Sequence, residues 1–417
     1  MLRPYPMRRL VFLAVALAAP LPAQLPDSTV CASPALPPAP ILAAPQPATI
    51  PIDVYSNHVY VKVCAGDRPL DFILDTGAGA TFLDLHTAER FGVKLGGSFT
   101  GRGAGAGTIA GAQLEGASVR LAGSSLVQPV PSALDLSRLP PREGHRMDGI
   151  LGYDFIRRFV VAIDYVKQEL RLYDARSFKY DGPGESIPVT FSGNHPHVDA
   201  EVRLADGATI KGRMVVDVGS SASLALTKPF VESNHLRDRV GKTIRRRSGG
   251  GVGGPVTADI GRVAALKLGR LEIERPITSL QGDSAGVMSG NAEWIGNIGG
   301  DILRRFTVFL DYANKRMILE PHAGANEPSE ADMSGLMLVM NDSLSAATVD
   351  YVVPGSAATD AGLVVGDTLV TIDGQPANGS AVREFRKRLR RDGERIVLTV
   401  RRGGAVRTVT LVLRRLV

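Results

Sequence analysis

A long internal repeat constrains this sequence more than any other feature. Residues 150–165 read ILGYDFIRRFVVAIDY and residues 297–312 read NIGGDILRRFTVFLDY, so a Gly, an Asp, Arg-Arg-Phe and Asp-Tyr recur in register. Upstream of each copy lies a Gly-rich stretch, and further upstream an apolar run ends in Asp-x-Gly, at Asp75 and at Asp217. A lone Asp-Thr-Gly would occur by chance in about one in ten chains of this length. Three features that recur in the same order instead indicate a duplicated domain.

The hydrophobic patterning within each repeat is typical of short strands. Runs such as 59–63, 71–74 and 118–121 are rich in β-branched residues and are separated by turns that contain Gly. The 46 Gly and 27 Pro residues also favour turns and short strands over a helical bundle. We therefore predict an all-β fold with two related β-barrel-like lobes, at residues 52–180 and 181–320.

The N-terminal residues have the pattern of an export signal. Three arginines precede the apolar run 10–19, and small residues lead to a cleavage point after Ala23. The run is too short for a permanent bilayer span, so we expect a removable signal peptide at 1–23, with an uncleaved anchor as the alternative. Residues 24–51, rich in Pro and Ala, are expected to form a leader. We expect an exported protein, periplasmic or secreted, with envelope association as an option and no integral membrane span after signal removal.

Composition argues against several other classes of function. The net charge is +6, but the basic residues are scattered, which does not indicate a nucleic-acid partner. The only cysteines are Cys31 and Cys64, which excludes a cysteine-based zinc site and leaves open whether they pair after export. Gly249, Gly251 and Gly254 have dinucleotide-fingerprint spacing but follow a run of arginines, not a strand. We expect no metal and no cofactor.

The duplicated Asp-x-Gly turns predict a particular chemistry. Two carboxylates in one site cannot both ionise cheaply, so one holds a proton while the other is charged. Such a pair can take a proton from a water molecule and protonate a peptide carbonyl, without a metal or a covalent intermediate. Asp75 and Asp217 are therefore the candidate catalytic residues.

The loop DTGAGAT at residues 75–81 resembles the active-site loop of the pepsin/retropepsin-like aspartic peptidases. That family also has an apolar pair followed by Gly beneath each loop, which residues 150–152 and 297–299 resemble, and a β-hairpin flap over the substrate, where this sequence has its Gly-rich stretches. The resemblance covers about residues 52–320. It implies that the active-site loops are supported by Thr76, Gly77, Ala78, Val218, Gly219, Ser220, Gly152 and Gly299, and that the flaps contain Gly103, Gly105 and Gly251.

The second loop departs from the family pattern. The family places a hydroxyl after each Asp, which bonds to the opposite loop; Thr76 has this hydroxyl and Val218 does not. Asn297 stands where an apolar residue is expected. Ser220 takes the position of Ala78, so we expect its hydroxyl to donate to Asp217, which would lower the pKa of Asp217 and leave the shared proton on Asp75.

The last segment, 335–417, follows a polar linker at 321–334 and has a different pattern. VPGSAA at 353–358, AGL at 361–363 and GDTLVTIDG at 366–374 resemble the PDZ domains attached to bacterial proteases. The resemblance implies that the C-termini of other proteins bind by strand addition. The basic run 383–391 is expected to be a solvated helix face. The implied carboxylate loop is Gly335, Leu336, Met337 and Leu338.

These features together predict an aspartic-type endopeptidase that acts on peptide or protein substrates. The main alternative is a non-catalytic, bilobal peptide-binding or scaffold protein, whose two lobes and PDZ domain hold the ends of protein chains. A weaker alternative is a structural envelope protein.

Overall fold

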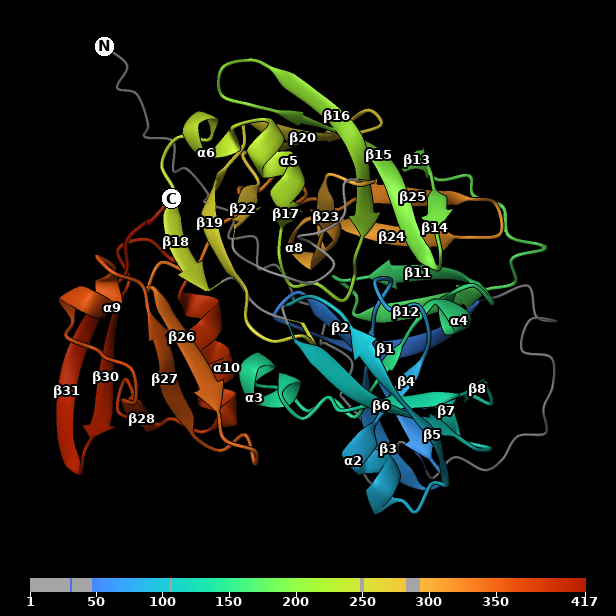
Figure 1. The fold of residues 1–417 in the computed structure, drawn as a ribbon, viewed down its shortest axis with the longest axis horizontal. Coiled ribbons are helices and arrows are strands. Elements are labelled where there is room, and N and C mark those ends of the chain that lie inside the picture. The colour runs from blue at the N-terminus through green and yellow to red at the C-terminus, as the bar shows by residue number, and fades with distance from the viewer. Residues whose placement is uncertain (1–30, 32–46, 106, 248–250, 283–292) are drawn as a thin grey trace, which may run out of the picture.

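The computed structural model describes residues 31, 47–105, 107–247, 251–282 and 293–417, and Figure 1 shows their arrangement. Strands dominate and the helices are short, which confirms the predicted all-β class. The predicted signal peptide lies outside the described residues. The leader ends earlier than predicted, because its last four residues, 48–51, belong to β1 (Ala48–Tyr55), which buries Ile50. In the described part of the chain, no helix has the length and apolar character that a membrane crossing needs.

Lobe 1 is built around the strand that leads to Asp75. β3 (Arg68–Leu74) pairs in parallel with β10 (Gly149–Leu151), which places Leu151 beside Leu74. The other elements of the lobe are β2 (His58–Ala65), β4 (Phe82–Asp84), β5 (Leu95–Arg102), β6 (Thr108–Leu114), β7 (Ser118–Leu121), β8 (Val127–Pro129), β9 (Ser132–Leu134), β11 (Val160–Asp164), β12 (Glu169–Tyr173), α2 (Leu85–Arg90), α3 (Leu139–Glu143) and α4 (Tyr153–Ile156).

Lobe 2 repeats this arrangement around the strand that leads to Asp217. β16 (Thr209–Val216) pairs in parallel with β23 (Gly296–Ile298), which places Ile298 beside Val216. β17 (Leu224–Leu226) is antiparallel to β23, as β4 is to β10. The other elements are β13 (Glu185–Pro188), β14 (Thr190–Ser192), β15 (His195–Arg203), β18 (Ile244–Arg247), β19 (Thr257–Arg262), β20 (Ala265–Leu268), β21 (Leu271–Glu274), β22 (Ile277–Gln281), β24 (Phe306–Asp311), β25 (Arg316–Pro321), α5 (Lys228–Ser233), α6 (Leu236–Arg239) and α8 (Gly300–Leu303).

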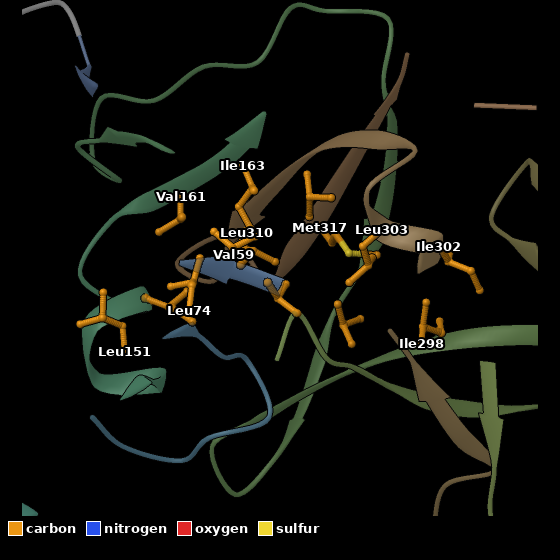
Figure 2. Close-up of a cluster of buried hydrophobic side chains, with 14 of the residues drawn as sticks. Val59, Leu74, Leu151, Val161, Ile163, Ile298, Ile302, Leu303, Leu310 and Met317 are labelled. Carbon is orange, nitrogen blue, oxygen red and sulfur yellow. The ribbon is translucent and has the colours of Figure 1, made fainter. Parts of the chain in front are cut away.

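The two lobes share one sheet and one apolar core. β11 of lobe 1 pairs antiparallel with β24 of lobe 2, so the equivalent strands of the two repeats lie side by side, with Asp164 opposite Thr307 and Asp311 opposite Val160. Every residue of both strands is buried, as expected for strands that are covered on both faces. Figure 2 shows side chains of both lobes meeting in this core, among them Leu74, Leu151, Leu310 and Ile298. The strands that end at the two Asp-x-Gly turns are thus anchored in one packed unit.

The C-terminal residues form a separate domain with its own core. Its helix α10 (Gly379–Arg388) buries Val382 and Phe385, one turn apart, against the sheet, and Leu389 continues the same apolar stripe. Strand β26 (Leu336–Met340) lies at the edge of this sheet and pairs only with β27 (Ala347–Val352) among the described strands. The remaining elements are β28 (Thr368–Ile372), β29 (Gln375–Pro376), β30 (Arg395–Arg402), β31 (Ala405–Val412) and α9 (Ala357–Asp360).

The predicted linker, 321–334, is a packed segment and not a loose connection. Ser329 is 1% exposed, and its hydroxyl accepts from Arg305 Nη2 at 2.6 Å and donates to Asp301 Oδ2 at 3.0 Å. Arg305 Nη1 also donates to the carbonyl of Ala325, at 2.9 Å. The polar composition of this segment suggested a free linker, but the segment supplies hydrogen-bond partners to two buried charged residues of lobe 2, Arg305 and Asp301.

This packing predicts that two truncated proteins differ in stability. A protein that ends at Glu320 leaves Arg305 and Asp301 without these partners, whereas one that ends at Glu330 keeps them. Unpaired buried polar groups cost about 1–3 kcal/mol each. In a domain of this size each kcal/mol lowers the Tm by about 2–4 °C. We expect the shorter protein to melt about 4–8 °C below the longer one in a thermal scan; equal melting temperatures would show that lobe 2 does not need the segment.

Candidate active site

The structure brings Asp75 and Asp217 together, each in the turn that follows a buried strand. Their backbone N–H groups donate to the parallel neighbouring strand, from Asp75 to Leu151 O at 3.0 Å and from Asp217 to Ile298 O at 2.9 Å. The two carboxyl groups lie close to each other, because a Cβ atom built on Gly77 would be 3.0 Å from Asp217 Oδ1 and 3.1 Å from Asp75 Oδ1. The predicted pair therefore lies at one site, held by equivalent backbone contacts from the two lobes.

The glycine of each Asp-x-Gly turn faces the opposite carboxyl group, which leaves no room for a side chain at Gly219 and little room at Gly77. A Cβ atom on Gly219 would lie 2.2 Å from Asp75 Cγ, and one on Gly77 would lie 3.0 Å from Asp217 Oδ1. The N–H of Gly77 donates to Asp75 Oδ1 at 2.7 Å. The two turns thus approach each other across the site, and the contact is closer at Gly219.

A single hydroxyl links the two loops. Thr76 Oγ1 donates to the carbonyl of Val216 at 2.6 Å and accepts from the N–H of Val218 at 2.9 Å. The reciprocal link is missing, as the sequence indicated, because Val218 has no hydroxyl; its side chain is fully buried in the apolar core instead. The loops are joined from the lobe 1 side, and packing replaces the second link.

Asn297 is the polar group that contacts Asp217, and it was not among the predicted site residues. Its Nδ2 donates to Asp217 Oδ2 at 2.5 Å. The expected donor, Ser220, has no such bond; its Oγ accepts from the N–H of Ala222 at 3.4 Å. The signal in the sequence was the departure at 297 itself, since a polar residue in an otherwise apolar strand beside the loop needs a partner.

The environments of the two carboxyl groups push their pKa values apart. Burial raises the pKa of Asp75 well above its usual value, and the charge of Asp217 raises it further. Burial also raises the pKa of Asp217, but the hydrogen bonds from Asn297 and Asp75 and the nearby His58 counter this effect. The arrangement therefore favours a protonated Asp75 and an ionised Asp217. The sequence predicted the same protonation states but expected Ser220, and not Asn297, to be the hydrogen-bond donor to Asp217.

Gly152 and Gly299 lie directly against the active-site loops. A Cβ atom on Gly152 would lie 2.1 Å from the carbonyl oxygen of Ala80, and one on Gly299 would lie 2.3 Å from that of Ala222. The next residue in each copy forms a hydrogen bond to the active-site loop: the N–H of Tyr153 donates to Ala78 O at 2.9 Å, and the N–H of Gly300 donates to Ser220 O at 2.6 Å.

The described residues of the two Gly-rich stretches lie between β5 and β6 and between β18 and β19, and they meet. The N–H of Gly107 donates to Gly253 O and the N–H of Gly253 donates to Ala104 O, both at 2.8 Å. A Cβ atom on Gly105 would lie 2.4 Å from the Gly253 carbonyl carbon. The predicted flap residues thus lie at a contact between lobes. Two of them have side-chain neighbours in the opposite hairpin, Gly103 next to Val252 and Gly251 next to Ala104.

Among the described residues, one group has the ligand atoms for a metal ion within mutual reach, namely Asp84, His86 and Asp135. Both of its carboxylates already have structural partners. Asp84 accepts from the N–H groups of Thr87 and Leu136, and Asp135 accepts from Ser137. The group lies outside the Asp75–Asp217 pair, and its geometry is explained by turn and helix-cap bonds.

The predicted carboxylate loop of the C-terminal domain has internal partners. Asp332 Oδ1 accepts from the N–H groups of Ser334 at 2.8 Å and Gly335 at 3.2 Å. The N–H of Leu336 donates to Ser334 Oγ at 2.9 Å. Met337 and Leu338 continue as strand β26, paired with β27. Three successive N–H groups at the start of the loop are therefore already engaged by side chains of the same domain.

Comparisons with known proteins agree with the sequence patterns. Residues 59–155 match a family model described as aspartyl protease, and residues 348–402 match one described as a PDZ domain. A solved structure, an aspartic proteinase from Irpex lacteus, is 14% identical with a TM-score of 0.40, over 67% of this chain and 99% of that chain. A comparison with curated proteins finds no match. The predicted resemblance is confirmed for two segments: one with the aspartyl protease pattern, which contains Asp75, and one with the PDZ pattern.

Proposed function

We propose that this protein is an aspartic-type endopeptidase, in which a water molecule between Asp75 and Asp217 attacks the peptide bond of a protein substrate. The observation that supports this most strongly is the close approach of the two carboxyl groups at the ends of two equivalent strands. Carboxyl groups whose environments push their pKa values apart are suited to opposite roles as acid and base.

In the proposed reaction, ionised Asp217 takes a proton from the water as its oxygen bonds to the peptide carbonyl carbon. Asp75 gives its proton to the carbonyl oxygen, which forms a neutral tetrahedral diol. Asp217 then protonates the peptide nitrogen, the C–N bond breaks, and a diol proton returns to Asp75 as the carboxylic acid forms. Protons balance over the cycle, and each carboxyl group ends as it began.

Asn297 has a positioning role in this scheme. Its amide donates to the oxygen Oδ2 of Asp217, which holds this carboxylate in place and stabilises its charge. The equivalent position in lobe 1 is Ile150, which pairs with Ile73 as Asn297 pairs with Val215, so the donor is present on one side of the pair only. This asymmetry assigns the base role to Asp217.

Substitution Asn297→Leu, which nearly preserves shape, should shift the pH dependence. Loss of the donor raises the pKa of Asp217, and activity requires Asp217 to be ionised, so the acid limb should move to higher pH. One lost hydrogen bond corresponds to about one pH unit. Ser220→Ala is the matched control and should leave the limb in place, because Ser220 bonds to Ala222. A pH profile of kcat/KM checks this; a shift with Ser220→Ala and none with Asn297→Leu would contradict the assignment.

A bilobal peptide-binding protein remains the second candidate, and the missing hydroxyl at Val218 favours it. To distinguish a peptidase from a peptide-binding protein, an unfolded protein substrate is incubated with the purified protein over a range of pH, and the products are analysed by mass spectrometry. New peptide termini that depend on Asp75 support the peptidase, whereas binding without cleavage supports the alternative.

We also propose that the protein is exported and acts in the periplasm or outside the cell. The predicted signal peptide motivates this, and the disulfide between Cys31 and Cys64 supports it, because such bonds persist in oxidising compartments.

A further inference from the structure

The PDZ domain contacts lobe 1 on the side that carries β26 and α10. In PDZ domains a bound peptide adds to the free edge of a strand beside a helix, and β26 is such an edge strand, with α10 packed beside it. Helix α3 of lobe 1 lies against β26, and Figure 1 shows it next to α10. Residues 139–144 are all half-buried. Residues 139–144 therefore lie against the side of the PDZ domain on which a peptide would bind.

Arg386 of α10 forms hydrogen bonds to three elements at this contact: β26 of the PDZ domain, and α3 and β1 of lobe 1. Its Nη2 donates to Leu338 O on β26 at 3.2 Å and to Arg142 O on α3 at 3.2 Å. Its Nη1 donates to Glu143 O and to the Tyr55 hydroxyl, the latter at 3.0 Å. The guanidinium thus binds last-turn carbonyls of α3, which have no partner within the helix, together with a carbonyl of the edge strand.

A second arginine fixes the same interface. Arg383, one turn before Arg386, makes two hydrogen bonds to the carboxylate of Asp53, and its guanidinium lies 4.6 Å from the centre of the Tyr55 ring. Burial alone would raise the pKa of Asp53, but hydrogen bonds from His145 and Arg383 hold it well below its usual value. The helix face that was expected to be solvated is instead the docking face.

We propose that residues 139–144 are an intramolecular ligand of the PDZ groove, and that the groove recognises an internal peptide segment through its backbone carbonyls. The engaged N–H groups of Ser334, Gly335 and Leu336 support this, because they leave those three positions without a donor for a terminal carboxylate. An external segment binds only when residues 139–144 leave, so the apparent affinity is reduced by the small fraction of open molecules. This proposal does not rest on peptidase activity.

Gly144 offers a way to open the groove from the lobe 1 side. Its φ is +72°, and a Cβ atom there would lie 2.7 Å from Arg386 Nη1 and 3.1 Å from the Tyr55 hydroxyl. Gly144→Val should displace α3 from the PDZ domain and leave the PDZ domain itself unaltered. Gly123→Val is the matched control, because Gly123 has φ +70° and open space around it.

The test measures binding of a fluorescein-labelled peptide with the sequence of residues 136–146, both ends blocked, to the full-length protein by fluorescence anisotropy. We expect the Gly144→Val variant to bind the peptide at least about tenfold more tightly than wild type, and the Gly123→Val variant to bind it as wild type does. When Arg386→Ala is added to Gly144→Val, we expect the increase in affinity to be lost. Equal binding by wild type and Gly144→Val would overturn the proposal.

Two further arms keep the test decisive. Asp53→Asn weakens the interface without a new side chain and should also tighten binding, by a smaller factor, which covers the case in which Gly144→Val fails to fold. A second probe, an unrelated hexapeptide that ends in Val, is compared with its C-terminal amide on the opened variant. Equal binding of acid and amide supports recognition of internal segments, and a tenfold preference for the free acid would overturn that part of the proposal.

Discussion

Replacing Gly219 with alanine should reduce peptidase activity by about a hundredfold, since a displacement of about 1 Å at a reacting group has an effect of that size. The added Cβ atom would lie 2.2 Å from Asp75 Cγ and 2.3 Å from Asp75 Oδ1, so the two loops must separate or the carboxyl group must turn away. Both movements separate the carboxyl group of Asp75 from that of Asp217. The measurement is kcat/KM on a peptide substrate, together with a thermal scan.

Gly97→Ala provides the control for the general cost of a glycine-to-alanine change. Gly97 lies in strand β5 and has no atom within 4 Å of a Cβ built on it. This variant should keep full activity. If Gly219→Ala kept the activity of wild type, the close approach of the two turns could not be a requirement of the reaction.

The sequence predicted those parts of the site that depend on local pattern. The duplicated motif predicted the two Asp-x-Gly turns, and the family resemblance predicted the segment beneath each turn and the one-sided hydroxyl link through Thr76; the structure contains each of them. The turns are predictable because each is formed by neighbours in sequence and occurs in both copies of the repeat, whereas the Thr76 link joins residues 140 apart and could be predicted only from the family resemblance.

Contacts between segments far apart in the sequence could not be predicted in the same way. Ser220 follows Asp217 by three residues, yet the partner of Asp217 is Asn297, eighty residues away. The polar composition of 321–334 suggested a free linker. The residues that this segment binds, Arg305 and Asp301, lie in lobe 2, so the sequence of the segment itself gave no sign of the contact. The basic face of α10 looked solvated for the same reason, since the carbonyl groups that it binds carry no signature in the sequence.

The largest effect is expected from the two aspartates themselves. Asp75→Asn leaves an amide that cannot give up a proton as an acid does, and Asp217→Asn removes the base, so either change alone should reduce kcat by about a thousandfold or more. Because Asn has nearly the shape of Asp, the fold should persist, and the thermal scan should show no loss. The Asp75→Asn variant tests the role of the acid and the Asp217→Asn variant tests the role of the base. Both variants must lose activity if the water is activated between the two carboxyl groups.

The most direct measurement is the rate at which the purified wild-type protein generates new peptide termini in an unfolded protein substrate, compared with the Asp75→Asn and Asp217→Asn variants under identical conditions. We predict cleavage by wild type with a bell-shaped dependence on pH, and none above background by either variant. Cleavage that persists in either variant, or a folded wild-type protein that binds the substrate without cleaving it at any pH, would contradict the claim that Asp75 and Asp217 form a catalytic pair.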